Sequence, residues 1–213
     1  ALTTSAADID AFLAEKWNLD ETRTVAEQLS EEISIIGENM HIRRFHKLVE
    51  NEGLVSAYIH AGGRIGVILQ VKSDVVNDAV AEMAKNIAMQ IAALSPKYTT
   101  RAEVDQEYLA HETAILTEAA KNEKPNAPEK VLNGMVQGRL NKELKEICLV
   151  DQTYVKAEDG KQSVQQYVDS VDKAQGAKIQ LVTFVRYETG EGLEKKSEDF
   201  AAEVAAQQAA AKK

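Results

Sequence analysis

The sequence holds a single cysteine, Cys148, among its 213 residues. One thiol alone can form neither an intramolecular disulfide nor a thiolate zinc site, so a reducing, cytoplasmic compartment fits the chain best. Long apolar runs are also scarce: stretches such as residues 67–69 and 147–150 are far shorter than the roughly 20 residues that a membrane-spanning helix needs. Since no charged segment followed by an apolar one opens the sequence, we expect neither a signal peptide nor a membrane partner.

Positively charged residues are in the minority. The chain has 25 Lys and Arg residues and 34 Asp and Glu residues, which give a formal net charge of −9. Nucleic acids and anionic lipids are bound mainly by Lys and Arg, which displace counterions, so we expect no direct nucleic-acid partner. An acidic chain can still meet a basic patch on another protein. The composition, with 44% hydrophobic and 28% charged residues, is that of an ordinary globular protein.

The motifs of common enzymes are missing as well. There is no P-loop, and the glycine-rich residues 61–66 lack the lysine and the helix start that phosphate binding uses, so they favour a turn between strands. Cys148 lies in an apolar run, which favours an inert buried thiol over a nucleophile. No spacing among the histidines completes a metal site; they are His41, His46, His60 and His111. We therefore predict no catalytic residue, no cofactor and no metal, and a protein that is not an enzyme.

Apolar stripes and capping boxes predict the helices. A short amphipathic helix is expected around Phe12, and the Thr-Val-Ala-Glu box at 24–27 opens a helix that Gly37 ends. Ser73-Asp74 is expected to cap a long helix that Ser95-Pro96 ends. A second box at 100–103 opens the first of two helices joined by a polar turn at 122–128, and another helix begins at Ser163.

Alternation of apolar and polar residues predicts the strands. Residues 54–60 and 64–72 flank the glycines of a tight turn and form a β-hairpin. Residues 41–48 could form another strand, and 147–150 and 153–155 read as short ones. Residues 178–188 form the clearest strand, and apolar side chains on both of its sides predict a central position in its sheet.

These elements predict an α+β fold. We expect two small, similar subdomains of antiparallel strands packed with helices, plus a projecting antiparallel helical hairpin. Residues 1–98 would form the N-terminal half of the core and residues 99–213 the C-terminal half. The helical hairpin would lie at about 101–146, with an entirely polar tip in solvent, and a C-terminal helix at about 196–211.

Six blocks of this sequence resemble the translation elongation factor Ts family. Ile-Gly-Glu-Asn at 36–39, followed by the paired arginines Arg43 and Arg44, is similar to the family signature. The blocks occur in the family's order and span residues 36–45, 56–67, 86–93, 136–142, 184–192 and 198–206. The resemblance covers nearly the whole chain from about Val25, which makes a chance match implausible.

The resemblance implies a cytoplasmic guanine-nucleotide exchange factor for elongation factor Tu. Such a factor would bind its partner, displace elements around the phosphates and the magnesium ion, and so weaken the bound nucleotide. The N-terminal half of the core and the C-terminal helix would contact the partner's nucleotide-binding domain, and the second half its third domain. The helical hairpin would be a coiled coil with a role in dimerisation, giving a homodimer or a two-to-two complex.

The resemblance also implies partner-binding residues: Arg43, Arg44, Ile65, Gly66, Gln90, Asp199 and Phe200. Other roles stay open for several of them. The two arginines could simply pair with nearby glutamates, since exposed ion pairs are common and weak. Ile65 has a core-like strand position, although the glycine beside it would let a partner's backbone approach closely. Phe200 could pack on its own domain instead of serving as an aromatic anchor.

The chain departs from the family pattern in two places. The family begins with a three-helix domain and a Thr-Asp-Phe-Val segment that reaches toward the magnesium site, and this sequence starts where that segment should have ended. It therefore resembles a fragment of a family member. The family often has histidine where this chain has Gln90, and glutamine cannot titrate.

Two other functions remain open from the sequence. The chain could be a structural or chaperone-like subunit that binds elongation factor Tu without exchanging nucleotide. It could also be a small hydrolase or transferase that uses histidine and glutamate, although no nucleophile–base pattern favours this.

Overall fold

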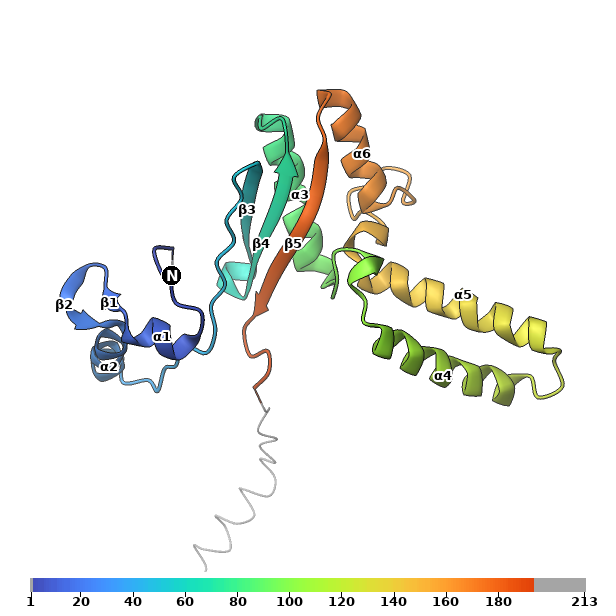
Figure 1. The fold of residues 1–213 in the computed structure, drawn as a ribbon, viewed down its shortest axis with the longest axis horizontal. Coiled ribbons are helices and arrows are strands. Elements are labelled where there is room, and N and C mark those ends of the chain that lie inside the picture. The colour runs from blue at the N-terminus through green and yellow to red at the C-terminus, as the bar shows by residue number, and fades with distance from the viewer. Residues whose placement is uncertain (1, 194–213) are drawn as a thin grey trace, which may run out of the picture.

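The structure is a computed structural model that describes residues 2–193. Figure 1 shows a group of short elements near the N-terminus, a central sheet with helices beside it, and a projecting pair of helices. The N-terminal group contains α1 (Ile9–Ala14), β1 (Lys16–Trp17), β2 (Asp20–Thr24) and α2 (Val25–Ile36). The C-terminal helix predicted at about 196–211 lies outside the described residues.

Helix α2 begins and ends where capping chemistry predicts. The Thr24 hydroxyl accepts a hydrogen bond from the Glu27 amide at 3.1 Å, and the Glu27 carboxylate accepts one from the Thr24 amide at 2.7 Å. Both amides would otherwise lack a partner. Gly37 then adopts a φ of 79°, the left-handed conformation that commonly ends helices. The predicted capping box and stop are confirmed.

Residues 37–52 form neither helix nor strand, so the strand predicted at 41–48 is wrong. The contacts of this segment come from side chains instead of a backbone ladder. Arg43 and Arg44 bind the turn after the last strand of the sheet. The side-chain amide of Gln70 donates to the carbonyl of Val49 at 3.3 Å. We call residues 41–50 the strap, because they run along the face of the sheet opposite the core.

The central sheet is antiparallel, with the order β3 (Gly53–His60), β4 (Ile65–Ser73) and β5 (Ile179–Glu188). The predicted hairpin of β3 and β4 is confirmed. Its turn contains Gly62 and Gly63 with φ of 66° and 96°, a conformation that residues with a side chain rarely adopt. Strand β4 is central, and β5 pairs only with β4 among the described strands, so its predicted central position is wrong.

A bulge explains why β5 has apolar residues on both sides of its pattern. The pairing with β4 moves from Thr183 opposite Gln70 to Leu181 opposite Val71, which leaves Val182 between the paired positions. An extra residue shifts the alternation by one. Leu181 and Phe184 therefore both pack against the same core, although strict alternation predicts opposite faces.

The core lies between one face of this sheet and the helices α3 (Asp78–Leu94) and α6 (Val164–Gln175) (Figure 1). Leu69 of β4 and Met83 and Ile87 of α3 are fully buried in one cluster. Shortening such a side chain to alanine typically costs about 2–5 kcal/mol. The apolar stripes read from the sequence are thus the residues that hold α3 against the sheet.

Two helices begin later than the sequence predicts. Helix α3 is capped by Asn77, whose side chain accepts from the Val80 amide at 3.0 Å, while Ser73 is still part of β4. Residues Arg101–Glu103 form a single 3₁₀ turn, and α4 (Gln106–Glu123) starts after Asp105. The box at 100–103 is interrupted because the extended residue Val104 is buried in a second small core.

Helices α4 and α5 (Glu129–Ile147) form the predicted antiparallel hairpin, which projects from the sheet in Figure 1. Residues 121–126 at its tip are exposed, as predicted. At its base, Cys148 is buried with Val104 and Leu144. The strands predicted at 147–150 and 153–155 are wrong: this region contains the 3₁₀ turn Leu149–Asp151 and only isolated bridges at Cys148 and Thr153.

The structure confirms an α+β fold with two small antiparallel sheets and a helical hairpin. The larger sheet takes β3 and β4 from residues 1–98 and β5 from residues 99–213. The similarity of the two halves and their boundary at residue 98 stay predictions.

Candidate functional site

An open depression of about 430 Å³ lies where the strap meets the ends of β4 and β5. Arg43, Arg44 and Gly66, three of the residues predicted to bind a partner, line it together with Tyr187. Ile65 precedes Gly66 in β4 and pairs with Glu188, another residue at the depression. The fold thus brings residues more than 120 positions apart in the sequence to one surface.

Both arginines are engaged by the turn that follows β5. Arg43 donates to the backbone carbonyl of Glu191 at 2.6 Å, and Arg44 donates to the Glu191 carboxylate at 2.8 Å. The Arg44 guanidinium also lies 4.4 Å from the centre of the Tyr187 ring, a cation–π arrangement. The alternative that these arginines pair with a glutamate is therefore realised for Arg44, while both side chains remain exposed enough to contact another molecule.

The electrostatics of this turn follow from its hydrogen bonds. The backbone amide of Glu188 and the Arg44 guanidinium hold the pKa of the Glu191 carboxyl below its usual range. Burial raises the pKa of the Tyr187 phenol, whose oxygen is hydrogen-bonded to His46 of the strap. At neutral pH the turn therefore carries an ionised Glu191 between two cationic side chains and beside a neutral tyrosine.

Gly66 is not required by packing within the chain. A Cβ atom built there would come no closer than 3.7 Å to the nearest heavy atom, the Cδ1 of Ile59, which is an ordinary contact. The glycine instead leaves the depression open beside the Arg43–Arg44 pair. Ile65 differs from it, since its side chain is partly buried against the main core.

Gln90 lies away from this surface and is fully buried in α3. Its amide nitrogen donates to Oε1 of Gln152 at 3.1 Å and to the carbonyl of Thr153 at 3.0 Å. Its amide oxygen accepts from the backbone of Val155 at 2.8 Å. A fully buried side chain with both ends paired fixes the segment 152–155 against α3, and its contact with a partner stays a prediction.

Asp199 and Phe200 lie outside the described residues. Tyr187 and Glu191 were missed by the sequence reasoning, although both belong to the block at 184–192. Their only signal was that resemblance, because the contact of Arg43 with Glu191 joins residues 148 positions apart.

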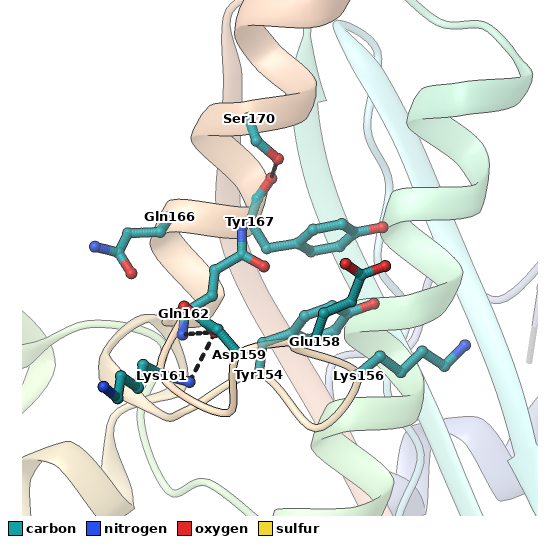
Figure 2. Close-up of a pocket in the computed structure, with 9 residues that line it drawn as sticks. All are labelled: Tyr154, Lys156, Glu158, Asp159, Lys161, Gln162, Gln166, Tyr167 and Ser170. Atoms are coloured by element: carbon teal, nitrogen blue, oxygen red, sulfur yellow. Dashed lines mark hydrogen bonds between the residues drawn. The ribbon is translucent and has the colours of Figure 1, made fainter.

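A second hollow, of about 850 Å³, lies beside α6 and contains no predicted site residue. Figure 2 shows the rings of Tyr154 and Tyr167 lying face to face, and their centroids are 4.2 Å apart at an interplanar angle of 9°. The Asp159 carboxylate accepts hydrogen bonds from the backbone amides of Lys161 and Gln162, which lower its pKa. These contacts order the loop at 156–162. The residues that line this hollow include no nucleophile hydrogen-bonded to a general base.

Residues 2–193 offer little for bond chemistry. Within this range no group of three or more His, Cys, Asp or Glu side chains is placed to hold a metal ion. Burial raises the pKa of the Cys148 thiol to about 11, so the thiolate is scarce at neutral pH. No helix in the same range is both long and apolar enough to cross a membrane.

Comparison with known proteins agrees with the resemblance. The family model described as "Elongation factor TS" matches residues 1–191. The chain is 47% identical over 207 residues to elongation factor Ts of Clostridioides difficile (strain 630), which covers 97% of this chain and 66% of that protein. It is 46% identical over 197 residues to elongation factor Ts of Clostridium perfringens (strain SM101 / Type A), covering 92% and 63%. The chain thus spans less than two thirds of the length of these relatives.

Proposed function

The chain belongs to the elongation factor Ts family, which comprises translation elongation factors and not enzymes, and we propose on this basis that it binds elongation factor Tu and promotes the release of GDP. It would do so in the cytoplasm and without a cofactor of its own. The partner-binding surface would include the depression at Arg43, Arg44 and Gly66, together with Ile65 beside it and Asp199 and Phe200 further along the chain.

The observation that carries this proposal is the depression itself. It places two arginines, an open backbone at Gly66 and an aromatic ring on one exposed surface. Arginine and aromatic residues are the side chains that most often dominate protein–protein binding. Asp199 and Phe200 follow Glu191 of this turn by eight and nine positions in the sequence, and we propose that one partner contacts both segments.

In the mechanism we propose, this chain and GDP weaken each other's binding to elongation factor Tu. Binding to elongation factor Tu would displace elements around its nucleotide and magnesium ion, so that complex formation weakens GDP. Thermodynamic linkage requires GDP to weaken the binding of this chain by the same factor. Gln90 would act indirectly, by holding the segment 152–155 in the half of the core at residues 99–213, which would meet another part of the partner.

We further propose that the arm formed by α4 and α5 joins two copies, as a homodimer or a two-to-two complex with the partner. Ile115 and Val131 of the arm are 49% and 45% exposed, which leaves apolar surface for such a contact. Light scattering on the chain alone and with elongation factor Tu would show a doubled mass if this is right, and single copies would refute it.

Calorimetric titration of elongation factor Tu, with and without saturating GDP, tests the proposal. An exchange factor must bind nucleotide-free partner much more tightly than the GDP-bound form. A structural or chaperone-like subunit would bind both forms equally, and an unrelated enzyme would bind neither. The Arg43→Ala/Arg44→Ala variant should weaken binding to the nucleotide-free form at least tenfold, while replacement of the exposed Lys85 by Ala on α3 serves as the control.

A further inference from the structure

A third hollow, of about 730 Å³, lies between the base of α5 and the N-terminal end of α6 and is rimmed by lysines. Lys142 and Lys145 project from the last turns of α5, and Lys161 comes from the loop before α6. Lys161 also lines the neighbouring hollow, and Figure 2 shows its side chain extending away from the tyrosine pair there. We call these three residues the lysine rim.

The positive charge of the lysine rim is not balanced locally. Within residues 2–193 none of the three ammonium groups forms an ion pair. Two carboxylates also line the hollow. Asp151 forms an ion pair with Arg101 at 2.8 Å, so only Glu146 is left to offset the charge of the three lysines. Lys142 and Lys145 are three positions apart on one helix, where like charges repel each other. The whole chain has a net charge of −9, whereas the lysine rim gathers three unpaired positive charges around one hollow.

The floor of the hollow is rigid. Gln152 is 3% exposed, and its amide donates to the carbonyl of Glu146 at 2.7 Å. The buried side chain of Gln90 is hydrogen-bonded to Gln152 and also to the backbone of Thr153 and Val155. Leu94, at the end of α3, is 46% exposed and adds an apolar wall. A surface that is already ordered loses little entropy when a partner binds.

We propose that the lysine rim is a docking site for an acidic, carboxylate-rich segment of a protein partner. Carboxylates complement three ammonium groups, and the exposed Leu94 suits a segment that mixes acidic and apolar side chains. Nucleic acid fits less well, because its binding surfaces extend basic charge along a groove, whereas here the charge is confined to one hollow of an acidic protein. The assignment rests on the proposed function in one respect, that elongation factor Tu is the partner.

One experiment tests the chemistry of the hollow without elongation factor Tu. Hexaglutamate is titrated into the isotope-labelled chain, and backbone amide shifts are followed by NMR. We expect the largest shifts at Gln152, Thr153 and Ser163, and their loss at high salt because screened charges attract weakly. Unmoved amides would overturn the proposal. Larger shifts at the same amides with hexauridylate RNA would overturn the choice of a carboxylate segment.

A second experiment uses elongation factor Tu and matched charge reversals. The hollow variant is K142E/K145E/K161E, and the control K85E/K130E/K173E reverses three exposed lysines elsewhere, so that both variants have the same net charge. We expect the hollow variant to bind at least tenfold more weakly and the control less than threefold. Equal weakening would overturn the proposal. The neutral variant K142Q/K145Q/K161Q, with an intermediate loss expected, repeats the test if the reversal disturbs folding.

The two kinds of failure are distinguishable. If the unmodified chain does not bind elongation factor Tu, the proposed function fails, and the hexaglutamate titration still decides the hollow. If the unmodified chain binds and both reversals bind equally, the proposed binding to elongation factor Tu stands and the lysine rim is refuted.

Discussion

Replacing Gln90 by alanine tests how strongly a buried amide holds α3 against residues 152–155. The variant removes three hydrogen bonds, to Gln152, Thr153 and Val155, from a side chain that is fully buried. Each bond contributes about 1 kcal/mol, and a donor or acceptor left unpaired in the interior costs about 1–3 kcal/mol. We therefore expect Gln90→Ala to lower the free energy of unfolding by about 3 kcal/mol, which corresponds to a fall in Tm of about 6–12 °C for a chain of this size.

Urea unfolding followed by circular dichroism measures the effect. Gln137, which is exposed on α5 and whose side chain makes no hydrogen bond within residues 2–193, is the matched control. Its replacement by alanine should change the free energy of unfolding by less than about 0.5 kcal/mol. A loss below about 1 kcal/mol for Gln90→Ala would refute the reasoning, because it would mean that water or a rearranged Gln152 replaces the network at little cost.

Three further results are expected. Gly66→Ala should leave Tm nearly unchanged, because the added Cβ meets only Ile59 at an ordinary distance, but should weaken binding to elongation factor Tu about tenfold by narrowing the depression; unaltered calorimetric affinity would exclude this surface. Replacing residues 124–126 at the exposed tip of the arm by Gly-Ser-Gly should shift Tm by less than about 2 °C by calorimetry, and a larger fall would show that the tip is packed. Because hydrogen bonds lower the pKa of Glu191, its contribution to stability is present at neutral pH and is lost as the pH falls through the folded pKa; Glu191→Gln should therefore make stability less sensitive to acid below about pH 5 in urea unfolding, and an unchanged acid dependence would contradict the assignment.

The sequence was most informative where local chemistry decides structure. The Thr24–Glu27 box, the turn at Gly62 and Gly63 and the start of α6 at Ser163 all depend on neighbours within a few positions. Each was predicted because the groups that must be satisfied lie beside the groups that satisfy them. The apolar stripes of β4 and α3 are equally local and identified the main core.

The errors arose where distant contacts override local pattern. Residues 41–48 have strand-like composition, but the strap at 41–50 meets the sheet through side chains, such as Tyr187 at His46 and Gln70 at Val49. The apolar residues on both sides of β5 indicated a central strand, whereas a bulge turns Leu181 and Phe184, one from each side, toward the same core. No α-helix begins at the box at 100–103, because Val104 is buried in an extended conformation. That burial depends on distant residues, so a local capping rule could not predict it.

The candidate site was predicted in part. The resemblance selected Arg43, Arg44 and Gly66, and the structure brings them to one depression. It could not reveal that Glu191 fastens both arginines, since that contact depends on how the strap crosses the sheet. The resemblance also selected Gln90, but it could not reveal that this side chain is buried between α3 and residues 152–155.

The release of fluorescent GDP from elongation factor Tu in a stopped-flow instrument tests the central claim most directly. The measurement uses unlabelled GDP as a trap and increasing concentrations of the chain. We predict that the release rate rises with concentration and reaches a plateau at least tenfold above the spontaneous rate, which is about 1.4 kcal/mol of barrier lowering. Binding with a release rate that stays at the spontaneous value would contradict exchange activity and leave a structural subunit as the better description of this chain.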